Sequence, residues 1–463
     1  MSLNLAPKNH VFYRNQNWHY PKVVRGDGVY LFTEDGRRYL DACSGSSVAN
    51  IGHGNHEVAE YTKKQMERIA FTHLSRWTVD TIEDCAEKVA KWAPGDLNHV
   101  YFVSGGSEAS ETAIKMVREY FIERDGNMSS KWKVISKWNS FHGNTLGSLS
   151  MTGISERRTI YDPMLINFPK IHQFYHYRNP WECKTLEETS IKAASELEGE
   201  ILRQGPDNIA AFISEPVVGS ATPGIHPEPI YFQMIKEICD KYDILLIIDE
   251  VMAGFGRTGR KFGIDHYGVQ PDIIIAAKGM SCGYTPIGAA VVSDEIFDTI
   301  MVKGSGVFVH GHTYGGNPLS CGIASKVIEI VEREKYVENS DRMGQYMMKK
   351  LKKLYQYPIV GDIRGKGLMI GIEFVKNQDT KKPFELKNKV NNLVMNNCLN
   401  EGVIMYPGGG SVDGNRGDHI LITPPININK SEIDELVDGL EKAIIKTCEH
   451  VSPLLKEEAC EDK

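Results

Sequence analysis

The 463-residue sequence contains no long hydrophobic run and no strong excess of charge of either sign. Its apolar runs, such as residues 244–248 and 273–277, are too short to cross a bilayer. The first 18 residues lack the apolar core of a secretion signal. The formal net charge of −7 gives no reason to expect nucleic acid or an anionic membrane as a partner.

Paired cysteines are also missing. The nine cysteines are scattered, with no CxxC motif and no spacing typical of metal ligands. In a chain of this length they indicate reduced thiols, so we expect neither a disulfide framework nor a metal site. These features together predict a cytoplasmic enzyme.

The middle of the chain alternates short apolar runs with longer helical patterns. The runs are nearly continuous in apolar residues, as expected when helices cover both faces of a parallel strand. This pattern predicts an α/β domain with a mostly parallel sheet. The predicted strands are residues 100–103, 133–136, 210–214, 244–248, 273–277 and 288–292, with helices that include 108–123 and 231–242.

The two ends of the chain have different patterns. Residues 29–41 alternate around a Glu-Asp-Gly turn and predict a β-hairpin. Beyond residue 335, helices are expected at 339–355, 387–400 and 431–450, with strands in 361–375 and at 419–422. We therefore expect an N-terminal segment (1–60) that contributes to a small domain, a large α/β domain (61–335) and a C-terminal α+β small domain (336–463).

Three ionisable residues follow predicted strands directly, namely Glu215, Asp249 and Lys278. Ligands of open α/β sheets bind at the carboxyl ends of the strands, so the three residues predict a site. Taken singly, a lysine there can be a surface residue and an acid can cap a helix. Lys278, however, lies between an apolar strand and a glycine-containing turn, and a lysine in a dry site can form a Schiff base.

Two further segments follow strands. At residues 104–107 (SGGS) a helix is expected to start, and the free N–H groups of a helix N-terminus can hold a phosphate; a serine-capped helix is the alternative. Phe141 and His142 could stack on a flat ring or belong to the core. The GFGRTG pattern at 254–259 does not directly follow its strand, and the next strand ends in a lysine, so a dinucleotide site is not indicated.

Three motifs resemble a known family: IIDEVMAGFGRTG (247–259), PDIIIAAKGMSCGYTPIGA (271–289) and GHTYGGNPLSC (311–321). They are similar to the class III aminotransferases, pyridoxal 5′-phosphate (PLP) enzymes that act on amines and ω- or β-amino acids. The similarity covers nearly the whole chain. It implies fold type I, the aspartate-aminotransferase-like fold, with a mostly parallel seven-stranded sheet in a large domain and a smaller α+β domain.

The resemblance also implies roles for single residues. Lys278 would hold PLP as a Schiff base, and Asp249 would pair with its pyridine nitrogen. Because a carboxylate keeps that nitrogen protonated, the ring draws electrons, and the released lysine can act as the base. The other implied cofactor contacts are Phe141 and Val251 on the ring faces, His142 beside Phe141, Glu215 near the ring, Gly106 and Ser107 at the phosphate, and Thr313 at the phosphate of the neighbouring subunit.

The implied reaction moves an amino group from an amine or an ω- or β-amino acid to a 2-oxo acid, pyruvate or 2-oxoglutarate, by a ping-pong mechanism. Because the role of Thr313 needs a second chain, a homodimer or a dimer of dimers is expected. Ser47 stands where well-known amine transaminases carry tryptophan, which indicates a wider or more polar substrate pocket. Arg416 is a candidate partner for a substrate carboxylate.

Other activities fit part of these observations. A racemase, aminomutase or phospho-lyase could share the fold and the cofactor but would need no amino acceptor. A lysine Schiff-base aldolase would need eight evenly spaced β/α units. A non-catalytic PLP-binding regulator would be expected to carry an additional DNA-binding or sensor module.

Overall fold

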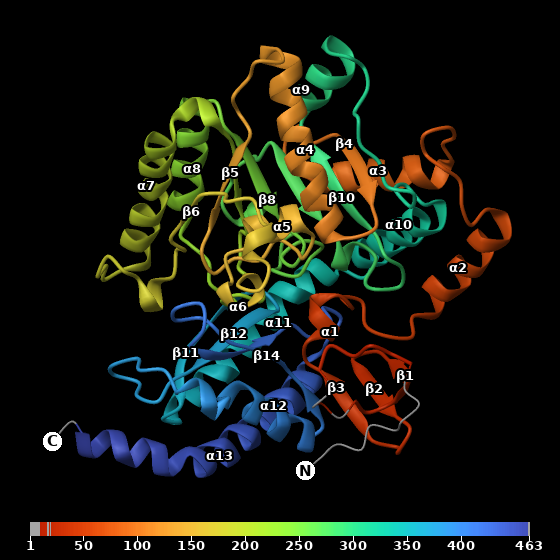
Figure 1. Ribbon diagram of the computed structural model, residues 1–463. Helices are drawn as coiled ribbons and strands as arrows, with labels where there is room; N and C mark the ends of the chain where they lie inside the picture. The colour runs from red at the N-terminus through yellow and green to blue at the C-terminus, as the bar shows by residue number, and fades with distance from the viewer. Residues whose placement is uncertain (1–9, 16–17, 19, 462–463) are drawn as a thin grey trace.

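The structure, a computed structural model, describes residues 10–461 apart from 16–17 and 19. Figure 1 shows a large domain in orange to green above a smaller domain in which the blue C-terminal part lies beside the red N-terminal strands. Among the described residues, none of the helices combines the length and apolarity needed to cross a bilayer.

The large domain is built on a seven-stranded sheet of order β4-β10-β9-β8-β7-β5-β6. Strand β10 is antiparallel to both of its neighbours and the other pairings are parallel, which confirms the mostly parallel sheet. This open sheet excludes the barrel of a Schiff-base aldolase. The strands are β4 (His99–Val103), β5 (Lys133–Lys137), β6 (Lys170–Ile171), β7 (Ile209–Ser214), β8 (Leu245–Asp249), β9 (Ile273–Ala276) and β10 (Gly288–Val292).

Helices cover both faces of this sheet. Side chains of α4 pack on one face, against β7 residues such as Ala211 and Ile213, whereas Phe212 points into the core on the opposite face. Every residue of β7 to β10 is buried, which explains the continuous apolar runs. The helices of the large domain are α2 (His56–Arg68), α3 (Asp80–Trp92), α4 (Gly106–Asp125), α5 (Leu146–Met151), α6 (Ser155–Arg158), α7 (Leu186–Gln204), α8 (Pro229–Lys241), α9 (Asp294–Phe297) and α10 (Pro318–Arg333).

The smaller domain contains two four-stranded sheets, β1-β2-β3-β13 and β11-β12-β15-β14. The predicted hairpin is confirmed, because β2 pairs antiparallel with β3. Strand β3 also pairs in parallel with β13, which joins the two ends of the chain; the domain boundaries at residues 60 and 335 stay predictions. The strands are β1 (Val23–Asp27), β2 (Tyr30–Thr33), β3 (Arg38–Asp41), β11 (Val360–Lys366), β12 (Met369–Phe374), β13 (Val403–Ile404), β14 (Tyr406–Gly408) and β15 (Asp418–Ile422).

The helices of this part are α1 (Ser44–Ser47), α11 (Tyr336–Leu351), α12 (Val390–Asn400) and α13 (Lys430–Glu461). The prediction of a last helix that ends at residue 450 is wrong, because α13 continues through Pro453 to Glu461.

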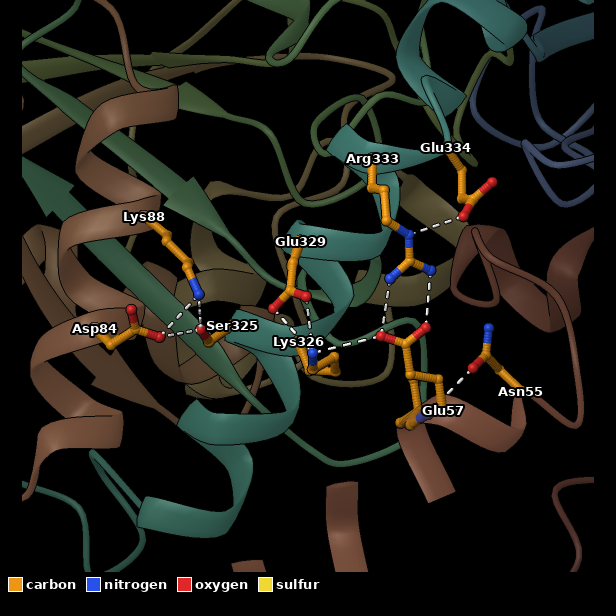
Figure 2. Close-up of polar contacts among 10 residues, drawn as sticks. Asn55, Glu57, Asp84, Lys88, Ser325, Lys326, Glu329, Arg333 and Glu334 are labelled. Carbon is orange, nitrogen blue, oxygen red and sulfur yellow. Dashed lines mark hydrogen bonds and ion pairs between the residues drawn. The ribbon is translucent and has the colours of Figure 1, made fainter. Parts of the chain in front are cut away.

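Polar contacts tie α2 and α3 to α10 (Figure 2). Arg333 of α10 donates to both carboxylate oxygens of Glu57 at 3.0 and 2.8 Å and lowers the pKa of Glu57 to about 2. Lys88 of α3 donates to Ser325 at 2.7 Å and to Asp84 at 2.9 Å. Exposed pairs of this kind stabilise by about 1 kcal/mol or less, so their main effect is to orient α2 and α3 against α10.

Candidate active site

Three neighbouring strands bring charged side chains to one edge of the large sheet. Glu215 directly follows β7, Asp249 ends β8, and Lys278 follows β9. The register pairs Ser214 with Ile248 and Asp249 with Ile275, so the three strand ends lie side by side. The structure therefore brings Glu215, Asp249 and Lys278 together, as the strand-end pattern predicts.

Asp249 is held in one orientation by two donors. Nδ1 of His142 lies 2.8 Å from its Oδ2, and the N–H of Val251 donates to its Oδ1 at 3.0 Å. Both side chains of the Asp249–His142 pair are buried. Within the described part of the chain, His142 Nε2 has no hydrogen-bond partner. The pair is thus a rigid acidic group at the end of a buried strand.

Glu215 links two of the strand ends. It accepts hydrogen bonds from the N–H of Phe141 at 3.2 Å and of Gly219 at 2.9 Å. Burial raises the pKa of its carboxyl group. Glu215 therefore fixes the segment that carries Phe141 and His142 against β7.

Lys278 begins a short turn with a left-handed backbone conformation, at φ = 46°. The turn is pressed against the 44–54 loop, because a Cβ on Gly279 would lie 2.5 Å from Nδ2 of Asn50. Burial lowers the pKa of Lys278 to about 8, although the nearby Asp249 and Glu215 act in the opposite direction. A sizeable fraction of the amine is therefore neutral, and nucleophilic, near pH 8.

We expect the pH dependence of amine labelling to show this shift. Because only the neutral amine reacts, competitive acetylation of the cofactor-free protein should modify Lys278 with a midpoint near pH 8, while exposed lysines titrate near their ordinary value of about 10.4. The measurement is mass spectrometry of the peptide that contains Lys278. A midpoint as high as that of the exposed lysines would contradict the lowered pKa.

The N-terminus of α4 forms a second part of the site. The helix starts at Gly106 without a side-chain cap at Gly105, so its first N–H groups lack helical partners. A Cβ on Gly106 would lie 3.1 Å from both methyl carbons of Val251. The N-terminal end of α4 therefore packs against Val251, two residues after Asp249. The hydroxyl of Ser107 accepts from the N–H of Asn144 at 3.1 Å. An uncapped helix end beside a serine hydroxyl suits a phosphate group.

The remaining predicted residues are placed differently. Ser47 is buried, and its hydroxyl has no partner among the described residues; its loop packs on the turn after Lys278. Thr313 is exposed on the loop before α10, and no hydrogen bond of its side chain is found in the described part of the chain. Arg416 is exposed and donates to Asp413 at 2.7 Å. The single chain does not bring Thr313 and Arg416 into contact with the other site residues.

Sequence reasoning missed Lys137, which ends β5 next to the site. It is fully buried, donates to Ser214 Oγ at 2.7 Å and lies 3.8 Å above the ring of Phe174. Burial lowers the pKa of Lys137 well below its usual range. The rule that singled out Lys278, a lysine at a strand end, also applies to Lys137 and could have found it.

Arg257, within the GFGRTG pattern, was also missed. Its guanidinium is buried and donates to the carbonyls of Leu368 and Pro424 in the smaller domain and to Asn50 Oδ1 at 2.6 Å. Burial lowers its pKa to about 10, so the group stays charged at neutral pH. The glycine pattern allows this close packing, since a Cβ on Gly259 would lie 2.8 Å from Asp341.

Replacing Arg257 should destabilise the protein strongly. Arg257→Met leaves buried acceptors unpaired, at about 1–3 kcal/mol each, so we expect a loss of about 3 kcal/mol, seen as a lower midpoint of thermal unfolding. The exposed Arg260 is the matched control, because among the described residues its side chain donates to the carbonyl of Gly259 alone. Arg260→Met should change stability by about 0.5 kcal/mol or less. Equal effects of the two substitutions would contradict a clamping role.

Comparison with known proteins agrees with this arrangement. The family model for class III aminotransferases matches residues 12–444. The chain therefore belongs to the class III aminotransferase family.

Curated relatives and solved structures match over almost the whole chain. An uncharacterized aminotransferase of Bacillus subtilis, YodT, is 40% identical over 92% of this chain and 95% of its own length. A putrescine–pyruvate aminotransferase of Pseudomonas aeruginosa is 36% identical over 92% of this chain and 90% of its own. The crystal structure of an omega transaminase from Pseudomonas jessenii in complex with PMP superposes with a TM-score of 0.87 at 32% identity, covering 94% of each chain.

Proposed function

We propose that this enzyme uses PLP to move an amino group from an amine or an ω- or β-amino acid to a 2-oxo acid, pyruvate or 2-oxoglutarate. One observation about the strand ends of the large sheet supports the proposal most directly. A partly neutral lysine lies at the same sheet edge as a buried carboxylate that a histidine holds in place. The names of the relatives, one acting with putrescine and pyruvate, support this substrate class.

The residues present fit the cofactor. When bound, PLP supplies a ring that accepts electrons from the substrate. Asp249, fixed by His142, would hold the pyridine nitrogen protonated, while Phe141 and Val251 would cover the ring faces. The uncapped helix end at Gly106 and Ser107 is proposed to bind the phosphate, with Glu215 near the ring.

Lys278 is proposed to do two things. Its neutral amine would hold the cofactor, and once released by the substrate it would be the base that moves a proton at the substrate carbon. Its lowered pKa suits both steps, because a protonated amine could do neither. Ser47 is proposed to line the substrate pocket, on a loop packed against the turn that follows Lys278.

A substrate screen tests this function. Amines and ω-amino acids are supplied with pyruvate or 2-oxoglutarate, and both the oxo acid consumed and the amine lost are measured. We expect one oxo acid to be consumed for each amine, with loss of the yellow cofactor absorbance when the amine is added alone. Turnover without any acceptor would favour the racemase, aminomutase or phospho-lyase alternative and overturn the proposal.

We also propose that the enzyme is at least a homodimer. Thr313 lies in a loop whose neighbourhood is unusually apolar for a surface: Trp77 is 69% exposed, Val309 82% and Tyr314 63%. Tyr314 contacts Phe71 with ring centroids 6.0 Å apart, which joins the loop of Thr313 to the segment that leads to Trp77. Exposed apolar patches of this kind mark interfaces, and a second copy would bring Thr313 to the phosphate of its partner's cofactor.

Replacing Thr313 should weaken cofactor binding. A hydrogen bond to a charged group contributes about 1.5–3 kcal/mol, so Thr313→Ala should raise the PLP dissociation constant by about tenfold or more in a titration of the cofactor-free protein. Thr380→Ala, at another exposed threonine, is the control. Unchanged affinity, or a monomer in sedimentation analysis of the loaded wild type, would contradict the shared site.

A further inference from the structure

Arg157, in the short helix α6, places a cation at the candidate site. Its Cζ atom lies 4.5 Å from the centre of the Phe141 ring. Phe141 is itself fixed, because its N–H donates to Glu215 Oε2 at 3.2 Å. The guanidinium therefore lies on the aromatic residue that immediately precedes the Asp249-bound histidine.

The guanidinium of Arg157 has no acidic partner among the described residues. Among the residues that the structure describes, it forms neither a hydrogen bond nor an ion pair, although Arg157 is half-buried. Its neighbour Arg158 differs, because it donates to the carbonyls of Ser150 and Thr152 and pairs with Asp162. Arg158 thus has a structural role, whereas the Phe141 ring is the contact found for the guanidinium of Arg157 within the described part of the chain.

The charge of Arg157 acts on other groups of the candidate site. Arg157 lies close enough to Lys278 and His419 to lower the pKa of both groups, which places its guanidinium at the candidate site. A half-buried cation without an anionic partner is stabilised when an anion binds to it. The planar fork of an arginine matches the two oxygens of a carboxylate.

We propose that Arg157 binds the substrate carboxylate and so determines specificity for carboxylate-bearing acceptors and donors. The inference rests on the proposed function, since a 2-oxo acid carries a carboxylate next to its reacting carbon. It assigns to Arg157 the role that the sequence suggested for Arg416. The structure instead pairs Arg416 with Asp413 at 2.7 Å, on an exposed loop.

Kinetics with matched acceptors test this assignment. Pyruvate is compared with butanal, which lacks a carboxylate, using the PLP-loaded wild type and Arg157→Gln with the same amine donor. We expect kcat/KM for pyruvate to fall about 10- to 100-fold in the variant, mainly through KM, while butanal changes less than about threefold. An equal fall with both acceptors would overturn the inference, as would loss of the pyruvate preference in Arg416→Gln instead.

Equilibrium binding keeps the inference testable if turnover fails. Benzoate and its uncharged amide, benzamide, are titrated calorimetrically into the loaded protein. Wild type should bind benzoate about tenfold or more tightly than benzamide, and Arg157→Gln should lose this preference, whereas Arg203→Gln, an exposed arginine on α7, should keep it. No preference in wild type overturns the role of Arg157, while a preference without transamination overturns the proposed reaction alone.

Discussion

Lys278→Ala should abolish turnover, with a fall in kcat of about 10⁴-fold or more, because this one side chain is proposed to supply both the covalent attachment and the base. The variant should still bind PLP, but more weakly and without a covalent bond, since the contacts proposed for Asp249, Phe141 and the α4 N-terminus would remain. The measurements are steady-state rates for the best amine found in the screen and equilibrium dialysis of the cofactor.

Lys192→Ala is a suitable control for this substitution, because Lys192 is exposed on α7, away from the strand ends. It should leave both the rate and the cofactor affinity unchanged. Near-normal turnover in Lys278→Ala would remove the residue from the mechanism, and unfolding of that variant would be detected separately by its thermal midpoint.

Asp249→Ala should lower kcat by about a thousandfold, equivalent to about 4 kcal/mol of transition-state stabilisation. Without the carboxylate, the proposed partner of the ring nitrogen would be missing, and the ring would accept electrons less well. His142 also loses its 2.8 Å partner, so the substitution disturbs the orientation of the neighbouring Phe141 segment.

Asp249→Asn separates charge from shape. It keeps the size of the side chain and the acceptor for the Val251 N–H, yet it should be nearly as slow as Asp249→Ala, because the negative charge is what matters. Asp379→Asn, on an exposed loop, is the control for general effects of removing an acid. A rate for Asp249→Asn within about threefold of wild type would contradict the assignment.

The central strands of the large sheet could be predicted well from the sequence because all of their residues are buried. Strands β7 to β10 are buried along their whole length, so each reads as a continuous apolar run with clear ends, and each predicted end lies within one residue of the observed one. The same clarity allowed Glu215, Asp249 and Lys278 to be placed at one sheet edge. Strand β6 has only two residues and carries no periodicity, so it was not predicted.

Some features depend on contacts that local patterns do not encode. Helix α7 was not predicted, although its capping box between Thr185 and Glu188 was a readable signal. The burial of Arg257 depends on carbonyls more than 100 residues away, at Leu368 and Pro424. Which of two arginines is free to bind an anion, Arg157 or Arg416, follows from partners brought together only in the fold.

The most direct test of the central claim is chemical reduction of the loaded enzyme with borohydride, followed by digestion and mass spectrometry. The account predicts one cofactor-labelled peptide, which contains Lys278, and no labelled peptide from Lys278→Ala. A label on any other lysine, including the buried Lys137, or no label at all, would contradict it.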